Sequence, residues 1–199
     1  MNKKIAIIGA GGHGKVVGEI ALLNHYEIIN FFDDKDNEIK EFPFTISGSI
    51  QNLKKNLKNY DAFFVAIGEN KIRFKIIEWL KKQKVNIVSL IHPNSTISKF
   101  CTLGYGSCVM ANAVVNPGAI IKEGVIINTC ASIDHDCVVE DFAHISPNCS
   151  ISGSVIIGKF THLGTGTSVH PGIHIGNNVK TATGSKVFKN ISDDTIHKN

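Results

Sequence analysis

An aliphatic residue recurs at every sixth position through the second half of the chain, from Ile91 to Val187. Because six is an even number, side chains at this spacing all point to the same side of an extended strand. Glycine, asparagine, proline and aspartate recur between them, so the chain must also turn about once in every six residues. A fixed short repeat of this kind determines the fold before any local propensity does. The recurring residues are Ile91, Ile97, Leu103, Val109, Val115, Ile121, Ile127, Ile133, Val139, Ile145, Ile151, Ile157, Leu163, Val169, Ile175 and Val187, with Thr181 as the polar exception.

One strand and one turn in six residues form one flat side of a coil, so three sides, or eighteen residues, close it. The recurring aliphatic side chains then fill the inside of a three-sided column. A small or β-branched residue follows each of them four positions later, as Ala143 and Cys149 do, and fits the crowded corner. About five coils fit between Ile91 and Val187. The array resembles the left-handed parallel β-helix of hexapeptide-repeat acyltransferases, and the left hand is implied by that resemblance, since strand crossovers are usually right-handed.

The first part of the chain alternates between strand and helix patterns. We expect strands at residues 4–8, 27–32, 62–67 and 85–90, and helices at 11–23, 50–57 and 70–82. Such alternation predicts a small parallel α/β sheet, about half of a Rossmann fold. Ligands bind at the carboxyl ends of parallel strands, which here are residues 9–14, 33–34 and 68–70. We therefore predict two domains, a half-Rossmann α/β domain at 1–90 and a β-helix domain at 91–199.

Residues 9–14 read GAGGHG, which satisfies the GxGxxG pattern between a strand and a helix. Glycines there let backbone N–H groups approach a phosphate at the helix N-terminus. Asp33 and Asp34 lie about twenty residues further on, where a ribose partner is expected. NAD fits poorly, because the α/β part is half of a dinucleotide fold and no dehydrogenase domain follows. A nucleotide with one diphosphate, such as a UDP-sugar, fits better, with His13 beside the phosphates or the sugar; a tight turn without any ligand is the remaining alternative.

Composition narrows the range of functions. The 199 residues carry a net charge of +4, and Arg73 is the one arginine among 21 basic residues. The scattered lysines form no nucleic-acid-binding stripe and no apolar run is long enough to span a bilayer, so we expect neither nucleic acid nor membrane insertion. The chain leads directly into a strand rather than a signal peptide, which favours a cytoplasmic protein. Five cysteines, an odd number without a CxxC pair, favour buried small side chains over disulfides or a zinc site.

Histidines are concentrated in the repeat. His144 and His162 are eighteen residues apart, so they should stack on adjacent coils. His135 and His144 are nine apart, which is half a coil, so they lie on different faces of one chain. Coils of this kind usually pack as trimers, and different faces of neighbouring chains then meet in one cleft. The histidines of the repeat are His135, His144, His162, His170 and His174, and their spacing alone does not choose among them.

Several segments together carry a resemblance to a known family. They are residues 9–14 (GAGGHG), 32–34 (FDD), 66–68 (AIG) with Asn70 and Arg73, 133–138 (IDHDCV) and 142–147 (FAHISP). In this order and spacing they resemble the PglD/NeuD-type sugar acetyltransferases across essentially the whole chain. The glycine loop alone is a weak signal, whereas the loop combined with an IxHD motif inside a hexad array is a strong one.

The resemblance implies an acetyl-CoA-dependent N-acetyltransferase that acts on a UDP- or dTDP-linked 4-amino-dideoxy sugar for surface glycan synthesis. It implies His135 as the general base, since an imidazole with a pKa of about 6.5 can accept the proton of an attacking amine. It implies that Asp136 orients the imidazole and that Gly153, one coil further on, offers a backbone N–H to the thioester oxyanion. No metal is required.

The same resemblance places acetyl-CoA on the repeat and the sugar nucleotide in the N-terminal domain. The implied donor-binding residues are His144, Gly164, Thr165 and Ala182. The implied acceptor-binding residues are Gly11, Gly12, His13, Asp33, Asp34, Ala66, Gly68 and Asn70. Arg73 would reach a phosphate or lie in solvent. Two features depart from the family: residues 181–183 (TAT) stand where the family has glycines that admit the adenine end of CoA close to the backbone, and the sequence ends in residues 196–199 (IHKN) instead of the family's Gly-x-Pro-Ala tail.

Two alternatives stay open at this point. One is O-acetylation of a sialic-acid-type sugar, which the sequence does not separate cleanly from N-acetylation, although the glycine loop with Asp33 and Asp34 favours a nucleotide-linked acceptor. The other is a non-catalytic, trimeric nucleotide-binding scaffold, which the intact IDHD motif and Gly153 disfavour and the missing Gly-x-Pro-Ala tail favours. The expected assembly is a homotrimer.

Overall fold

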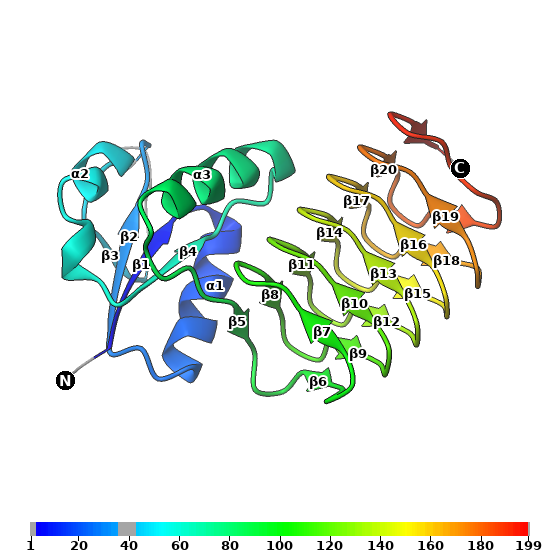
Figure 1. The fold of residues 1–199 in the computed structure, drawn as a ribbon, viewed down its shortest axis with the longest axis horizontal. Helices are drawn as coiled ribbons and strands as arrows, with labels where there is room; N and C mark the ends of the chain where they lie inside the picture. Colours follow the sequence, from blue (N-terminus) through cyan, green and yellow to red (C-terminus); the bar gives the residue numbers. More distant parts are fainter. Residues whose placement is uncertain (1–2, 36–42, 199) are drawn as a thin grey trace. The chain divides into compact units, whose positions relative to one another are not determined.

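The computed structural model describes residues 3–35 and 43–198. The chain forms two compact units, Met1–Leu90 and Ile91–Asn199, which are a small α/β unit and a long stack of short strands (Figure 1). Within the described residues, no helix combines the length and the apolar character needed to cross a bilayer. The first two residues, on which the expected absence of a signal peptide partly depends, lie outside the described residues.

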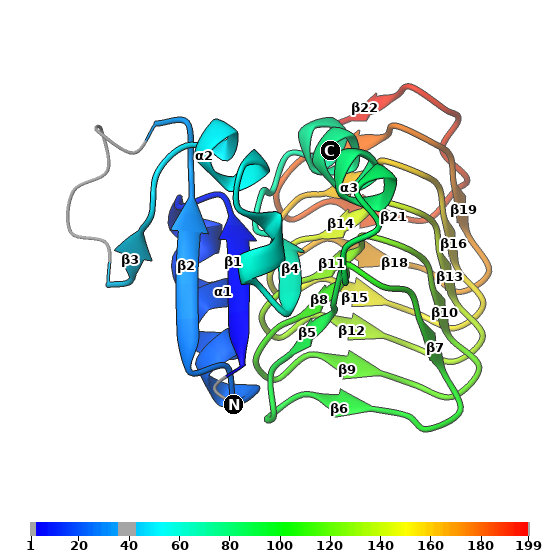
Figure 2. The ribbon, with the colours of Figure 1, turned by 60° about the vertical axis from the view of Figure 1, so that its left-hand side comes forward.

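The N-terminal unit is built on a parallel sheet in the order β3-β2-β1-β4. Its elements are β1 (Lys4–Ile8), α1 (Gly12–Leu23), β2 (Ile28–Phe32), β3 (Thr45–Ile46), α2 (Ile50–Lys54), the 3-10 helix η2 (Leu57–Asn59), β4 (Ala62–Val65) and α3 (Asn70–Lys82). Strand β1 has neighbours on both sides and is buried from Ile5 to Ile8, the continuous apolar run that a parallel strand covered on both faces requires. Figure 2 shows α1 lying against one face of β1 and β2.

Most of the predicted elements of this unit are confirmed, but the strand predicted at residues 85–90 is reduced to a single parallel bridge beside β4. Within the described part of the chain, Ile87 makes an isolated bridge to Phe63, and Leu90 already belongs to the repeat. Residues 85–89 are half-buried or exposed, so little apolar burial stabilises a further strand there. Strand β3 supplies the outer strand on the other side of the sheet instead. The predicted helix at 50–57 is also shorter, because α2 ends at Lys54.

The C-terminal unit is a three-sided parallel β-helix, as predicted. Among the described residues its two-residue strands form three sheets, in which each strand pairs with one eighteen residues away until the last coil. The first sheet holds β5 (Leu90–Ile91), β8 (Cys108–Val109), β11 (Ile126–Ile127), β14 (His144–Ile145), β17 (His162–Leu163), β20 (Lys180–Thr181) and β22 (Ile196–His197). The second holds β6 (Thr96–Ile97), β9 (Val114–Val115), β12 (Ser132–Ile133), β15 (Ser150–Ile151), β18 (Ser168–Val169) and β21 (Lys186–Val187). The third holds β7 (Thr102–Leu103), β10 (Ile120–Ile121), β13 (Val138–Val139), β16 (Ile156–Ile157) and β19 (His174–Ile175).

The turns between these strands repeat one backbone conformation. Residues in the left-handed region recur every six positions and are Gly106, Asn112, Gly118, Gly124, Cys130, Asp136, Phe142, Asn148, Ser154, Phe160, Gly166, Gly172, Asn178 and Gly184. Glycine, asparagine and aspartate tolerate this region best, which explains why they recur between the aliphatic residues. The residue that follows each of them from Asn112 onward is buried, as Cys137 and Ala143 are. The turn therefore places small side chains inside, while the corner residues range from exposed, as Asp136 is, to buried, as Phe142 is at 3% exposure.

The polar exception in the core is accommodated by hydrogen bonds. Thr181 is 8% exposed, and its Oγ1 accepts the Gly164 N–H at 2.8 Å and lies 2.8 Å from Thr167 Oγ1. A buried hydroxyl with partners avoids the cost of an unsatisfied polar group. Cys137 and Cys149 are buried in the small-residue position, as predicted, while Cys101 is partly exposed.

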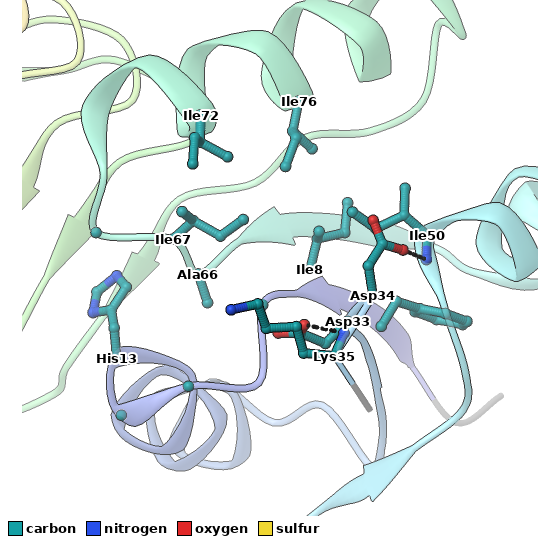
Figure 3. A pocket seen from close by; sticks show the side chains of 15 residues that line it. Ile8, His13, Asp33, Asp34, Lys35, Ile50, Ala66, Ile67, Ile72 and Ile76 are labelled. Carbon is teal, nitrogen blue, oxygen red and sulfur yellow. Dashed lines mark hydrogen bonds between the residues drawn. The ribbon is translucent and has the colours of Figure 1, made fainter. Parts of the chain in front are cut away.

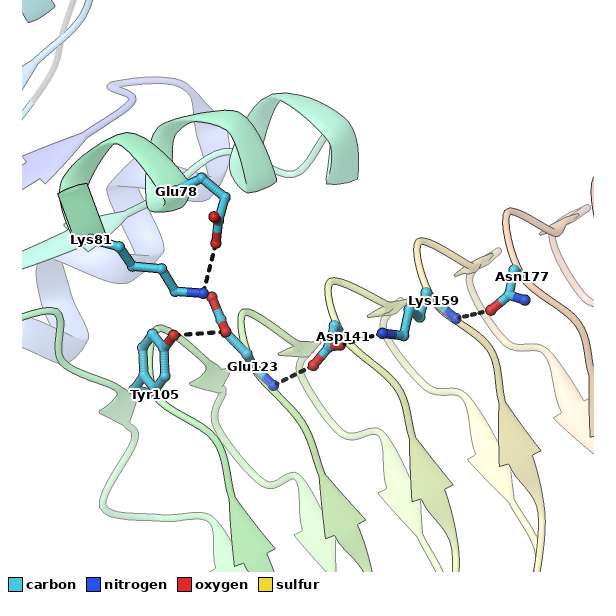
Figure 4. Close-up of polar contacts among 7 residues, drawn as sticks. All are labelled: Glu78, Lys81, Tyr105, Glu123, Asp141, Lys159 and Asn177. Carbon is cyan, nitrogen blue, oxygen red and sulfur yellow. Dashed lines mark hydrogen bonds and ion pairs between the residues drawn. The ribbon is translucent and has the colours of Figure 1, made fainter.

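Polar side chains connect successive coils at the turns between the third and first sheets (Figure 4). Tyr105 Oη donates to Glu123 at 2.7 Å, and the Glu123 N–H donates to Asp141 at 3.3 Å. Lys159 pairs with Asp141 at 2.9 Å, which raises the pKa of Lys159, and its N–H donates to Asn177 at 2.8 Å. Because these contacts are largely exposed, each contributes below about 1 kcal/mol. This corner is a structural ladder between coils.

Candidate active site

A pocket of about 470 Å³ lies at the carboxyl ends of β1, β2 and β4, where parallel sheets bind ligands. Figure 3 shows Ile72 and Ile76 pointing from α3 into this pocket, with His13 at one end and Ile50 at the other. The lining residues are Ile8, Gly9, Gly11, Gly12, His13, Phe32, Asp33, Asp34, Lys35, Ile50, Ala66, Ile67, Gly68, Ile72 and Ile76. Its walls are mostly aliphatic, and its polar groups come from the loops after β1 and β2.

The glycines of the loop after β1 have two different roles. Gly9 has a φ of +106°, and a side chain there would meet the Ala66 carbonyl; a side chain at Gly14 would meet the Gly9 carbonyl. These two glycines close the turn between β1 and α1. Gly11 and Gly12 have open space where a side chain would stand. Helix α1 begins at Gly12 without a side-chain cap, which is the arrangement that binds anions at helix N-termini.

The two aspartates after β2 line the pocket and also shape it. Asp33 accepts the Ala10 N–H at 2.8 Å and the Lys35 N–H at 2.9 Å, so it ties the end of β2 to the glycine loop. Asp34 accepts the Ile50 N–H at 2.9 Å, at the first residue of α2. A carboxylate at a helix N-terminus is stabilised by the helix dipole. Sequence spacing placed both aspartates at the site but did not reveal these backbone contacts.

His13 stands in the first turn of α1 and lines the pocket. Its Nε2 is buried and has no hydrogen-bond partner among the described residues. Burial, reinforced by the positive charge of Arg73, lowers the pKa of His13 to about 4. The ring is therefore neutral at neutral pH, because desolvation disfavours its charged form. It brings a ring nitrogen, Nε2, that is available for a hydrogen bond, and no charge, to this end of the pocket.

Arg73 is fully buried in α3. Of the two alternatives expected for this side chain, exposure to solvent is therefore wrong. Its Nη1 donates to the carbonyls of Ile67 at 2.9 Å and Gly68 at 3.1 Å, and its Nη2 donates to Asn70 Oδ1 at 2.9 Å. Hydrogen bonds to the loop carbonyls thus replace those that the guanidinium would make to water, and they fix the loop after β4 that forms one wall of the pocket. Asn70 is 6% exposed, engaged by Arg73, and outside the pocket lining, unlike the other predicted acceptor residues.

In the C-terminal unit, His135 and Asp136 lie at a turn between the second and third sheets. The residues of this turn in successive coils are 98–100, 116–118, 134–136, 152–154, 170–172 and 188–190, which we call the His135 corner. His135 Nδ1 is 2.8 Å from Asp136 Oδ2, and the two side chains are 59% and 67% exposed. This bond raises the pKa of His135 and assigns Nδ1 the donor role, which leaves Nε2 as the acceptor in the neutral ring.

Glycines on the neighbouring coils make room for this pair. A side chain at Gly153, one coil after His135, would stand 2.6 Å from Cε1 and Nε2 of the imidazole. A side chain at Gly118, one coil before Asp136, would collide with its carboxylate. The predicted residues His135, Asp136 and Gly153 therefore meet at one place. The contribution of Gly118 was missed, although its position eighteen residues before Asp136 is visible in the sequence.

The residue before His135 is also held in place. Asp134 Oδ1 accepts the backbone N–H of His135 at 2.8 Å and the Asn116 amide at 2.9 Å. These bonds lower the pKa of Asp134, with Asn116 as the larger cause. The negative charge of Asp134 is a further cause of the raised pKa of His135. Asn116, Asp134 and Asp136 thus fix both the backbone and the ring of His135.

His144 and His162 stack on adjacent coils of the first sheet, as predicted. Their ring centroids are 4.4 Å apart with an interplanar angle of 8°. Asn128 Nδ2 lies 3.3 Å from His144 Nε2, and Ser146 Oγ lies 3.1 Å from His162 Nε2. The side-chain amide of Asn128 is a donor, so His144 Nε2 accepts and its Nδ1 carries the proton. His144 and His135 lie on different sides of the β-helix, as their nine-residue spacing predicted.

The other predicted donor residues follow the strands that carry these histidines. Gly164 packs against the backbone of the next coil, where a side chain would meet the carbonyls of Thr181 and Ala182. Thr165 and Ala182 are exposed on successive turns of the same corner. Within residues 3–35 and 43–198, no group of three or more histidine, cysteine, aspartate or glutamate side chains is arranged to hold a metal ion.

Comparison with known proteins identifies the family. The family model of the PglD N-terminal domain matches residues 4–80. The structure of the acetyltransferase domain of PglB from Neisseria gonorrhoeae FA1090 is 39% identical, with a TM-score of 0.93, and the match covers 100% of this chain and 97% of that one. The chain belongs to the PglD-type sugar acetyltransferase family. Its two units accordingly have the fold predicted, a small α/β domain followed by a left-handed parallel β-helix.

Other relatives are similar to this chain over different lengths. PerB from Caulobacter crescentus, in complex with CoA and GDP-perosamine, is 31% identical with a TM-score of 0.89, over 96% of this chain and 91% of that one. The UDP-N-acetylbacillosamine N-acetyltransferase of Bacillus subtilis (strain 168) is 35% identical over 113 residues. That match spans about half of the curated relative, or 52% of its length. The Neisseria domain has also been solved in complex with acetyl coenzyme A.

Proposed function

We propose that this protein is an acetyl-CoA-dependent N-acetyltransferase whose acceptor is a nucleotide-linked 4-amino-dideoxy sugar. The observation that carries the proposal is the His135–Asp136 pair over Gly153, because it presents an exposed base whose Nε2 is the accepting nitrogen. The relatives support the reaction class, since they include a UDP-N-acetylbacillosamine N-acetyltransferase and an enzyme with bound CoA and GDP-perosamine. No metal or acyl-enzyme takes part in the proposed reaction.

In the proposed reaction, the sugar amine attacks the carbonyl carbon of the acetyl thioester. A new C–N bond forms, the C–S bond breaks, and CoA leaves as a thiolate. His135 Nε2 takes the proton that the nitrogen loses, and the imidazolium can then return it to the leaving sulfur. Asp136 stabilises the imidazolium through its 2.8 Å bond to Nδ1. The raised pKa of His135 makes it a stronger base, which suits an acceptor as basic as an amine.

Gly153 supports the same reaction in two ways. It gives the His135 ring its space, and its backbone N–H makes no hydrogen bond to another described residue. We propose that this N–H donates to the thioester oxygen as negative charge develops on it. A donor aimed at such an oxyanion contributes about 3 kcal/mol to catalysis in known acyl-transfer sites.

The pocket of the α/β unit is the proposed site of the nucleotide. Its aliphatic walls, formed in part by Ile50, Ile72 and Ile76, suit the faces of a base, and the N-terminus of α1 suits a diphosphate. Asp34 and Asp33 stand where the ribose hydroxyls would lie. The neutral ring of His13 would bond the sugar or a phosphate oxygen without adding charge. The volume of about 470 Å³ fits one nucleoside better than a dinucleotide.

The donor site is proposed to form between copies of the chain in a homotrimer. His144, Gly164, Thr165 and Ala182 lie along the first sheet and the corner after it, whereas His135 lies on another corner. One pantetheine arm can contact both sets if they come from neighbouring chains. The exposed aliphatic residues Ile120 and Ile156 of the third sheet offer apolar surface for such packing. We place the reaction in the cytoplasm, where acetyl-CoA and sugar nucleotides are made.

The proposal is tested with His135→Ala. Loss of the base should lower kcat by about 10²–10⁴ and leave the KM for the nucleotide sugar little changed. Steady-state kinetics with acetyl-CoA and a UDP-linked 4-amino sugar measures both constants, and circular dichroism checks that the variant is folded. Full activity in this variant would remove His135 from the role of base. Acetylation of a hydroxyl on a sialic-acid-type sugar instead of the amine would replace the proposed acceptor.

A further inference from the structure

We infer that Cys137 is a positioning residue for the oxyanion donor: its buried thiol holds the peptide group between Ser152 and Gly153 so that the Gly153 N–H faces the reacting thioester. This inference rests on the proposed function, which assigns that N–H to the oxyanion. It gives a role to a buried cysteine that the proposed reaction does not otherwise use.

The contact that carries the inference joins the thiol to a carbonyl on the next coil. Cys137 is fully buried, and its Sγ donates to the Ser152 carbonyl oxygen at 3.1 Å. The bond comes from inside the column, because the side chain of Cys137 belongs to the apolar core there. Burial raises the pKa of the Cys137 thiol, so the thiol stays protonated at neutral pH and keeps the hydrogen that it donates.

The Ser152 carbonyl and the Gly153 N–H belong to one peptide group. A trans peptide is planar, and its C=O and N–H point in opposite directions. A bond that fixes the carbonyl toward the inside of the column therefore fixes the N–H toward the outside, where His135 lies. Gly153 is buried, and its N–H has no acceptor among the described residues. Because buried N–H groups are nearly always paired, this donor is open to a ligand atom.

The same hydrogen bond makes the Gly153 N–H a better donor. A carbonyl that accepts a hydrogen bond draws electron density from its own peptide nitrogen, and linked hydrogen bonds strengthen one another by about 10–30%. Negative charge on the thioester oxygen would thus meet a chain that runs from the Gly153 N–H through the Ser152 carbonyl to the Cys137 thiol. The thiol therefore supports the oxyanion without touching the substrate.

The neighbouring coils of the His135 corner lack this bond. The position that Cys137 occupies holds Ala119 one coil earlier and Val155 one coil later, and neither side chain has a donor. Across these three described coils, a side-chain donor at this position therefore stands only behind the peptide group of Gly153. The cysteine coincides with the one peptide of these coils to which the proposed reaction assigns a role.

Serine and threonine make the equivalent bond at another corner of the column. Ser107 Oγ donates to the Lys122 carbonyl at 3.0 Å, and Thr161 Oγ1 donates to the Gly176 carbonyl at 2.6 Å. Alanine occupies the same position of the repeat at Ala143. The chain itself thus shows that serine can replace the cysteine as donor, and that the fold accepts alanine, which removes the donor.

The test compares Cys137→Ala with Cys137→Ser in steady-state kinetics with acetyl-CoA and a UDP-linked 4-amino sugar. Cys137→Ala should lower kcat by about tenfold, which is less than the loss of about 10²–10³-fold that removal of an oxyanion donor causes, and leave both KM values within about twofold. Cys137→Ser should keep kcat within about twofold of the wild type, because its hydroxyl donates to the same carbonyl. The acidic limb of the pH profile of kcat/KM should not move in Cys137→Ala, because the base His135 is unchanged.

Ser107→Ala is the matched control for a loss of stability. It removes a donor from the same position of the repeat, at the corner between the third and first sheets. It also deprives the buried Val125 N–H of the Ser107 Oγ that accepts it at 3.0 Å. We expect the melting temperature to fall at least as far as in Cys137→Ala, while kcat keeps the wild-type value.

A measurement without turnover tests the same bond. The amide nitrogen of Gly153 responds to the hydrogen bond on the carbonyl of its own peptide group. Its resonance in the NMR spectrum should therefore move in Cys137→Ala and return toward the wild-type position in Cys137→Ser.

The outcomes separate this inference from the proposed function. A wild-type kcat in Cys137→Ala, or a loss that serine does not restore, would overturn the positioning role of Cys137. An equal loss of kcat in Ser107→Ala, or an acidic limb that moves in Cys137→Ala, would also overturn it, because the effect would then come from stability or from His135. If the wild type acetylates no amino sugar, the proposed function fails; a Gly153 resonance that does not move in Cys137→Ala would overturn the inference separately.

Discussion

The contact between His135 and Gly153 gives the sharpest test of the catalytic geometry. The methyl group of Gly153→Ala would stand 2.6 Å from Cε1 and Nε2 of the imidazole, whereas ordinary contact begins at 3.4 Å. The ring must therefore retreat by about 0.8 Å or more. A misplacement of about 1 Å in a reacting group costs about 10²-fold in rate, so we expect kcat to fall by about two orders of magnitude. The backbone N–H of residue 153 stays in place, so the loss isolates the position of the base.

The stability of this variant should change little. Gly153 does not adopt a left-handed φ, so alanine fits its backbone, and His135 can swing into solvent because its side chain is 59% exposed. We expect the free energy of unfolding to change by less than about 1 kcal/mol. The assay is steady-state kinetics with acetyl-CoA and the amino sugar nucleotide, combined with thermal melts.

A double-mutant cycle completes the test. In a His135→Ala background the added methyl group meets no ring, so Gly153→Ala should lower the residual kcat by less than threefold, a change of below about 0.7 kcal/mol. If Gly153→Ala costs the same factor in both backgrounds, the methyl group acts on something other than His135. If the single variant keeps full activity, the close approach of Gly153 to the imidazole does not position the base.

Three further predictions address the pH dependence and the nucleotide pocket. Asp136 is the largest cause of the raised pKa of His135. Asp136→Asn should therefore move the acidic limb of the pH profile of kcat/KM to lower pH and lower its plateau. An acidic limb that stays in place would contradict the effect of Asp136 on the pKa of His135. Burial lowers the pKa of His13 to about 4 in the folded protein, so protonation of this ring favours the unfolded chain. The free energy of unfolding should therefore be highest above about pH 6.5 and should decrease by up to about 3 kcal/mol as the pH falls to 4. Chemical denaturation over this pH range should show that His13→Asn lacks this decrease. An identical pH dependence of the free energy of unfolding in the wild type and in His13→Asn would show that His13 is not its cause. A UDP-linked amino sugar should raise the melting temperature of the wild type, and NADH should not. Ile72→Asp, which places a charge in the wall of the pocket, should abolish this increase. Stabilisation by NADH alone would favour a dinucleotide-binding site instead.

The β-helix could be predicted from the sequence because its repeat is a geometric constraint. An even period with a turn in every unit fixes which side chains point inward, and eighteen residues per coil fix which residues become neighbours. The stacking of His144 on His162 and the meeting of His135 with Gly153 both follow from that spacing. The corner conformation at Asp136 follows as well, because residues that tolerate a positive φ recur every six positions.

The α/β unit was less predictable because its site depends on contacts between distant segments. Nothing in the spacing indicates that Asp33 holds the Ala10 N–H or that Arg73 is buried against the loop after β4. The apolar walls of the pocket were also missed, although Ile72 and Ile76 are four residues apart on α3 and therefore share one face of the helix. The edge strand β3 is two residues long, which is too short for a recognisable alternation.

The central claim is that an imidazole held by Asp136 removes the proton from a sugar amine as the acetyl group arrives from acetyl-CoA. The most direct measurement is mass spectrometry of a panel of nucleotide-linked 4-amino sugars, incubated with acetyl-CoA and either the wild type or His135→Ala. The account predicts that at least one sugar gains a single acetyl group on its amine with the wild type, at a rate at least about a hundredfold above that of the variant. Equal product from both proteins, or acetyl transfer only to a hydroxyl group, would contradict it.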